Sequence, residues 1–154
     1  MTNVVLAVAN TFLQYAKRDN ISVTPMKLQK LIYILYKTYL QKYKSKLFSD
    51  VFSVWKYGPV QLDVYNAFKK YKSNAIDDYY YEDGKFYTLR LKGNGNLEST
   101  FDEVWDKYRD YSGIYLSKLT HLEGTAWEKA KSKGLPYILD EDILKEQSYE
   151  QYIK

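Results

Sequence analysis

The feature that most constrains this chain is a long helical pattern that opens at Thr24-Pro25. Thr24 suits an N-cap because its hydroxyl accepts an amide hydrogen bond, and Pro25 fits the first helical position. At about 100° per residue, one side of this helix is apolar and the other side carries lysines. The apolar side holds Leu28, Leu31, Ile32, Leu35, Tyr36, Tyr39 and Tyr43, and the other holds Lys27, Lys30, Lys37 and Lys44, with Tyr33 beside them. The pattern predicts an amphipathic helix to about Lys44, with its lysine ridge in solvent.

Apolar residues recur at helical spacing through most of the remaining chain. They predict helices over residues 4–16, 60–71, 97–111, 114–122 and 125–133, and a last helix from residue 140. Residues 51–57 form a candidate strand, and residues 79–88 a candidate β-hairpin around Asp83-Gly84. With 154 residues and 45% hydrophobic content, the chain can bury one core. We expect a mainly α fold with a small antiparallel β element (α+β), a compact single domain over residues 1–154.

The chain offers no segment suited to a membrane. Its most apolar stretch, residues 28–40, contains two lysines and is shorter than the roughly 20 residues that a crossing needs. It also contains no cysteine, so disulfides and thiolate metal sites are excluded. We therefore expect a cytoplasmic protein without a membrane partner.

Charge is distributed unevenly along the chain. Residues 1–72 contain 12 Lys and Arg and three Asp and Glu, a formal charge of +9, whereas residues 73–154 carry −5. We favour attraction between the two halves within one fold over an acidic or polyanionic partner. Lysines interleaved with tyrosines would suit nucleic-acid binding, but only three arginines are present and base readout depends strongly on arginine. A nucleic-acid-binding regulator therefore remains an alternative and not the first choice.

Catalytic and metal-binding patterns are missing from the sequence. His121 is the only histidine, and its neighbour Glu123 does not share its helix face at i, i+2. Adjacent acidic residues point apart and make poor acid–base pairs. Phosphate-binding and serine-nucleophile motifs are absent as well. We expect no catalytic residue, no cofactor and no metal, and a structural role for the His121 imidazole, hydrogen-bonded near Trp127.

Three blocks of sequence together resemble one known family. They are residues 8–13 with 24–33, residues 55–60 (Trp-Lys-Tyr-Gly-Pro-Val) followed by Val64-Tyr65, and residues 116–123 (Leu-Ser-Lys-Leu-Thr-His-Leu-Glu) followed by Trp127 and Ala130. In this order they resemble the Panacea-domain antitoxins, the SocA/GepA-like, phage-associated group. The resemblance is strongest over residues 4–130 and weaker in residues 74–96 and after Gly134. It implies a mostly helical fold.

The resemblance also implies a function. Members bind and neutralise a cognate protein toxin, usually encoded beside them, without catalysis. We therefore expect an antitoxin of a toxin–antitoxin system that acts through protein–protein interaction. A phage-encoded counter-defence or degradation-adaptor protein is a further alternative. The sequence leaves open the toxin's identity and whether the chain forms a homo-oligomer.

Two groups of residues follow from these blocks. For the partner-binding cluster we predict Lys27, Lys30, Tyr33, Tyr57 and His121. For structural motif roles we predict Thr24, Pro25, Leu28, Trp55, Gly58, Pro59 and Trp127. In the second group Leu28 belongs to the core, and Gly58-Pro59 fixes a turn that starts the following helix.

Overall fold

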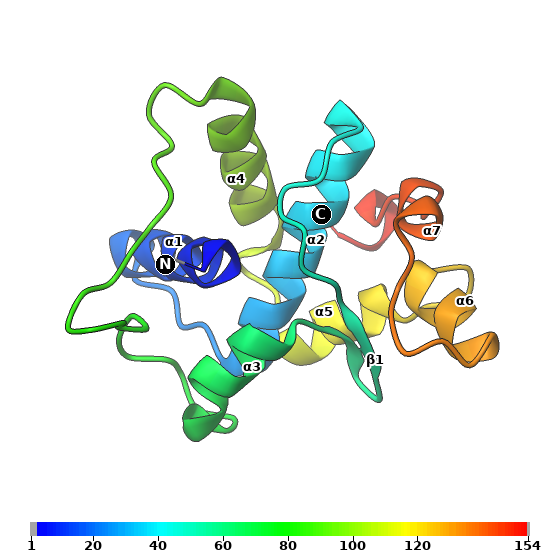
Figure 1. The fold of residues 1–154 in the computed structure, drawn as a ribbon, viewed down its shortest axis with the longest axis horizontal. Coiled ribbons are helices and arrows are strands. Elements are labelled where there is room, and N and C mark those ends of the chain that lie inside the picture. The colour runs from blue at the N-terminus through cyan, green and yellow to red at the C-terminus, as the bar shows by residue number, and fades with distance from the viewer. Residues whose placement is uncertain (1–2, 154) are drawn as a thin grey trace.

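A computed structural model describes residues 3–153 as helices arranged around one central helix, with a short β-ribbon (Figure 1). In chain order the elements are α1 (Val4–Asp19), α2 (Pro25–Tyr43), β1 (Ser53–Trp55), β2 (Gly58–Val60), α3 (Leu62–Phe68), η1 (Lys69–Tyr71), α4 (Gly95–Tyr108), α5 (Gly113–Thr120), α6 (Ala126–Ser132), α7 (Asp140–Leu144) and η2 (Glu150–Tyr152). The mainly helical class with a small antiparallel sheet is confirmed. None of the helices within residues 3–153 combines the length and apolar content that crossing a bilayer requires.

The central helix is α2, which contacts α1, α3, α4, α5, α7 and β2 (Figure 1). Its start is the predicted one, because the Thr24 hydroxyl accepts from the Lys27 amide at 3.2 Å and Pro25 is the first helical residue. Leu28 is fully buried, as expected of a core residue. Neighbours cover α2 on nearly every side, so little of this helix is left for solvent.

The prediction that the lysine ridge faces solvent is wrong for three of its four lysines. Lys27, Lys30 and Lys37 are only 1% to 6% exposed, while Lys44 is exposed as expected. The reason is the central position of α2, whose polar side is covered by β2, α5 and the C-terminal segment. Each buried ammonium instead donates a hydrogen bond to a backbone carbonyl, as a buried polar group must.

The predicted β-hairpin over residues 79–88 is also wrong. The Asp83-Gly84 turn is present, with φ of +51° and +77°, but the two arms form only one bridge between residues 82 and 85. The competing partner is Asn10 of α1, whose side chain accepts from the Tyr80 amide at 2.9 Å and donates to the carbonyls of Tyr80 and Tyr87. This segment therefore packs along the outside of α1 (Figure 1) instead of forming a sheet.

Ion pairs join the two oppositely charged halves of the sequence. Lys37 pairs with Glu146 at 3.1 Å, and Asp19 with Arg109 at 3.0 Å. Lys42–Glu103 and Lys46–Asp140 also cross between the halves. The three lysine pairs agree with the expected attraction between a basic first half and an acidic second half, whereas Asp19–Arg109 has the opposite sense.

Candidate functional site

The small sheet is the ribbon β1–β2, which carries two exposed aromatic residues at its tip. Ser53 pairs with Val60, Val54 with Pro59 and Trp55 with Gly58. Trp55 is 38% exposed and Tyr57 is 55% exposed. Large aromatic side chains in solvent gain free energy when a partner covers them, so this tip is the starting point of the candidate site.

The ribbon is held to α2 on one side by a pair of glutamines and a lysine. The Gln29 side-chain Nε2 donates to the Gln61 backbone carbonyl, and the Gln61 backbone N–H donates back to Gln29 Oε1, both at 2.9 Å. Lys30 Nζ donates to the Pro59 carbonyl at 2.7 Å. Gln61 also caps α3 by accepting from the Val64 amide at 3.0 Å. The expected turn at Gly58-Pro59 is wrong in position, because the ribbon turns at Lys56-Tyr57 and Gly58 and Pro59 lie in β2; the helix that follows, α3, begins after Gln61 as its cap.

The ribbon is held on its other side by α5 and α6. The Ser117 hydroxyl donates to the Tyr57 carbonyl, and Trp127 Nε1 donates to the Trp55 carbonyl at 2.8 Å. These bonds fix the backbone of Trp55 and Tyr57, while both side chains stay partly exposed. A rigid backbone lowers the entropy that a binding surface loses when it is occupied.

Gly58 allows the close packing that these bonds need. Its φ is +111°, a conformation that residues with a Cβ rarely adopt. A Cβ placed there would lie 2.7 Å from Thr120 Oγ1 and 3.3 Å from Lys30 Nζ. Only glycine therefore lets the ribbon lie this close to both α2 and α5.

Beside the ribbon lies a cavity of about 410 Å³, here called the aromatic groove. The Trp55 and Tyr65 rings meet edge to face across 4.8 Å in its wall, and Tyr57 lies at its margin. Its lining residues are Pro25, Met26, Gln29, Lys30, Trp55, Lys56, Tyr57, Val60, Val64, Tyr65 and Lys72. Its size and mostly apolar lining are typical of a binding site.

The charged groups of the aromatic groove are all basic. Lys30, Lys56 and Lys72 line it, and no carboxylate does. Burial lowers the pKa of Lys30 from its ordinary value to about 7, because desolvation disfavours the charged ammonium. The groove therefore combines aromatic walls with positive charge that no carboxylate in its lining offsets.

Only part of the predicted partner-binding cluster meets at this groove. Lys30 and Tyr57 both line it, although Lys30 is buried. Lys27 lies one turn earlier on α2, and its ammonium donates to the Arg109 carbonyl at the C-terminal end of α4. Burial lowers the pKa of Lys27, an effect partly opposed by Asp110. The expectation that Lys27 and Lys30 are free surface lysines is therefore incorrect.

Tyr33 is completely buried, and the expectation that it faces outward is wrong. Its hydroxyl donates to Glu146 Oε1 at 2.9 Å, and Glu146 Oε2 accepts from the Tyr149 hydroxyl. Lys37 completes the cluster by pairing with Glu146 at 3.1 Å and lying 3.4 Å from the Tyr149 ring centroid. Burial raises the pKa of both tyrosine hydroxyls, and the Glu146 charge raises it further. This cluster joins α2 to the C-terminal segment.

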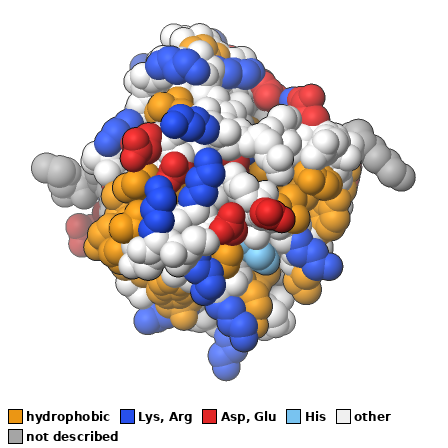
Figure 2. Space-filling view, turned by 90° about the vertical axis from the view of Figure 1, so that its right-hand side faces the viewer, with side chains coloured by type: hydrophobic (Ala, Val, Ile, Leu, Met, Phe, Trp, Pro, Cys, Tyr) orange, Lys and Arg blue, Asp and Glu red, His pale blue; other side chains and the backbone are white. Residues whose placement is uncertain are grey.

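His121 lies outside the aromatic groove. Its ring packs on Trp127 with centroids 5.2 Å apart, so the expected neighbour is correct. The expected hydrogen bond is not found at Nδ1, which is buried and has no hydrogen-bond partner within the described chain. The imidazole is visible on a face where lysines and carboxylates are interspersed (Figure 2). The structure therefore does not bring His121 together with Tyr57 and Lys30.

Sequence analysis missed several residues that build the site. Tyr65, Gln61 and Lys72 were not among the predicted partner-binding residues, although Tyr65 belongs to the sequence block that starts at Trp55. For Tyr65 a signal was present, because Trp55, Tyr57 and Tyr65 are three large aromatic residues within eleven positions of one sequence block. Gln61 and Glu146 carried no local signal, since their partners Gln29 and Tyr33 are far away in sequence.

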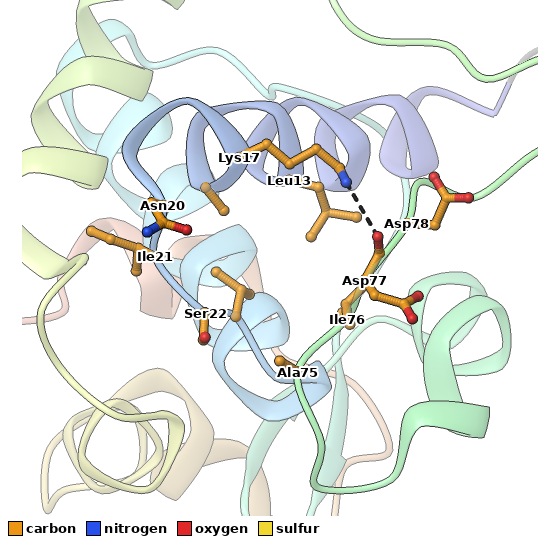
Figure 3. Close-up of a pocket in the computed structure, with 11 residues that line it drawn as sticks. Leu13, Lys17, Asn20, Ile21, Ser22, Ala75, Ile76, Asp77 and Asp78 are labelled. Carbon is orange, nitrogen blue, oxygen red and sulfur yellow. Dashed lines mark hydrogen bonds between the residues drawn. The ribbon is translucent and has the colours of Figure 1, made fainter.

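A second hollow lies between the end of α1 and residues 75–78 (Figure 3). It measures about 170 Å³, and Lys17 Nζ spans it to donate to the Asp77 carbonyl at 3.2 Å. Its one cationic group therefore already has a partner within the chain, the other charged residues of its lining are Asp77 and Asp78, and aromatic residues are absent from that lining. Across residues 3–153, His, Asp and Glu side chains nowhere gather in threes as a metal ion would require.

Fold and site together define a helical domain that holds a rigid aromatic ribbon beside an apolar groove. Residues 28–128 match the model of the family described as antitoxin SocA-like, Panacea domain, and the chain belongs to this family. The match includes β1, β2, α3 and α5, and therefore most of the aromatic groove. No curated protein and no solved structure matches the chain significantly. Membership of this family supports an antitoxin role in general.

Proposed function

We propose that this protein neutralises a cognate protein toxin by direct binding, and that the aromatic groove is the contact surface. The observation that carries the proposal is that the family-matched segment itself builds a rigid, exposed aromatic ribbon beside an apolar cavity. Protein interfaces take most of their affinity from a few aromatic anchors in pockets of this kind. The role is non-catalytic and cytoplasmic in this proposal, and the toxin is encoded by an adjacent gene.

The nucleic-acid alternative has less support after the fold is known. Of the seven lysines that suggested it, Lys27, Lys30 and Lys37 are buried and donate to backbone carbonyls. The others, Lys44, Lys69, Lys70 and Lys72, are exposed. Groups already paired and desolvated within the chain contribute little to phosphate binding. We therefore advance the protein-binding function alone.

The test is co-expression with the product of the adjacent gene, followed by growth measurement and co-purification. We expect the wild-type chain to restore growth and to co-purify with the toxin. The double variant Trp55→Ala, Tyr57→Ser should weaken toxin affinity by about 30-fold or more, because an aromatic anchor contributes roughly 2 kcal/mol or more. The main chain carbonyls of both residues remain, so the bonds from Trp127 and Ser117 persist.

The matched control is Tyr87→Ser. The exposed fraction of Tyr87, 40%, is similar to that of Trp55, 38%. Tyr87 lies on the segment outside α1, away from the groove. It should neutralise the toxin like wild type. Full neutralisation by the groove variant would refute the proposed surface, and a harmless neighbour that does not co-purify would refute the proposed function.

A further inference from the structure

We propose that the aromatic groove binds an acidic peptide segment, in which an apolar or aromatic side chain enters the groove and flanking carboxylates meet Lys56 and Lys72. The inference rests on the proposed function and specifies the chemistry of the toxin segment. Three observations support it: the groove lysines lack carboxylate partners, the groove walls are apolar, and the backbone groups on both edges of the ribbon are already occupied.

Positive charge at the groove is uncompensated, unlike that of many other lysines. Lys37, Lys42 and Lys107 each pair with a carboxylate. Among the ion pairs found in residues 3–153, neither Lys56 nor Lys72 takes part. An anionic partner would supply the missing charge, and such complementarity favours both encounter and register.

The walls of the groove favour a peptide over a phosphate ligand. Trp55, Tyr65 and Val64 give it apolar surface, which an inserted side chain would cover. Arginine, which binds phosphate through two parallel hydrogen bonds, is absent from the lining. The Lys30 ammonium already donates to the Pro59 carbonyl. Carboxylates on a flexible segment suit the two remaining lysines at the margin.

The ribbon cannot take the peptide as an added strand. On the outer edge of β1, the Val54 amide donates to the Pro136 carbonyl at 3.1 Å, and Ser53 bridges to Tyr137. On β2, Pro59 has no N–H and its carbonyl accepts from Lys30. Strand addition needs a free row of backbone groups. Recognition must therefore come from side chains in the groove.

The probe is an acetylated, amidated peptide, Glu-Asp-Glu-Leu-Phe-Glu-Asp-Glu, titrated into ¹⁵N-labelled full-length protein. The readout is the indole N–H resonance of Trp55, assigned by Trp55→Phe. The indole of the buried Trp105 donates to Asp19, away from the groove, and serves as the internal reference. We expect a saturable shift at Trp55 that weakens as salt rises from about 0.05 to 0.5 M, where screening becomes strong.

Three comparisons decide the result. The same peptide with Lys in place of every Glu and Asp should bind at least about fivefold more weakly. The variant Lys56→Gln, Lys72→Gln should lower the affinity for the acidic peptide roughly fivefold, since each exposed ion pair contributes a factor of about 1.4 to 5 in affinity. The control variant Lys92→Gln, Lys145→Gln removes two exposed lysines outside the groove and should bind the acidic peptide with unchanged affinity. No saturable shift, equal binding of both peptides, or an unchanged lysine variant would overturn the inference. So would stronger binding of an eight-residue oligothymidine.

Charge reversal separates this inference from the proposed function. If Lys56→Glu, Lys72→Glu still captures the toxin while Trp55→Ala, Tyr57→Ser does not, the groove binds the toxin but the acidic segment is refuted. If neither variant affects capture, the proposed surface fails. Loss of capture in both variants supports the groove and its charge preference together.

Discussion

Lys30 should make the free energy of unfolding of this protein rise with pH, and the substitution Lys30→Met should remove that rise. Its buried ammonium has a pKa lowered to about 7, whereas the unfolded chain keeps the ordinary value of 10.5. Between these values the unfolded state binds more protons than the folded state, so the free energy of unfolding increases with pH. The cost of the buried charge is largest below about pH 7 and disappears as pH approaches 10.5.

The magnitude follows from the difference in bound protons. Near pH 7 Lys30 is about half protonated when folded and fully protonated when unfolded, and by pH 9 it is neutral when folded. With a limiting slope of about 1.4 kcal/mol per pH unit, the free energy of unfolding gains about 2 kcal/mol from this group between pH 7 and pH 9. Lys30→Met cannot titrate and should lack this gain.

The assay is urea unfolding of wild type and Lys30→Met at pH 7, 8 and 9. Other titrating groups are common to both chains, so the wild-type advantage over the variant should grow by about 2 kcal/mol across this range. The lost bond to the Pro59 carbonyl adds an offset that does not depend on pH. Lys92→Met, which removes an exposed lysine, is the control. A wild-type advantage that stays constant from pH 7 to pH 9 would refute the reasoning.

Three further predictions concern the contacts that hold the fold. Glu146→Gln leaves the buried Lys37 ammonium without its counter-charge and should lower the free energy of unfolding by about 3 to 5 kcal/mol in urea unfolding; a loss under 1 kcal/mol would contradict a buried ion pair. Asn10→Ala removes the partner of the Tyr80 amide and should speed its hydrogen exchange, at a cost of about 1 to 3 kcal/mol; unchanged exchange would show another partner. Gly58→Ala should cost about 2 kcal/mol or more in thermal unfolding, from its positive φ and the crowding at its Cβ; a wild-type melting temperature would contradict that packing.

The parts of the fold that sequence predicts well are those set by local chemistry. The Thr24-Pro25 start of α2 follows from a cap and a fixed φ, and both are found as expected. The helix predicted over residues 125–133 also starts from a local contact, since the Thr125 hydroxyl caps α6 by accepting from the Glu128 amide at 3.2 Å. Such features depend on residues within one turn of each other. They therefore do not depend on how the rest of the chain packs.

The incorrect expectations depend on neighbours that are distant in sequence. Lysines every three or four residues mark a solvent face only if nothing covers that side, and here β2 and the C-terminal segment cover it. The arms of the 79–88 segment have good strand composition, but the Asn10 side chain offers their backbone a better placed partner. Nothing local to residues 79–88 reveals Asn10.

The candidate site was predictable in part for the same reason. Trp55, Gly58 and Pro59 could be identified because they form one short motif around a turn. The groove required Met26, Tyr65 and other residues from three elements, which only the packing of α2, the ribbon and α3 brings together. The partner-binding role of the predicted cluster stays a prediction, now centred on Tyr57.

Hydrogen exchange on the complex with the product of the adjacent gene is the most direct test of the aromatic groove as the toxin-binding surface. Amides of residues 53–65 and of the first turn of α2 should exchange more slowly in the complex than in the free protein. Amides of residues 79–88, outside α1, should not change. Protection confined to residues 79–88, or to the face that carries His121, with none at the ribbon and α3, would contradict the account.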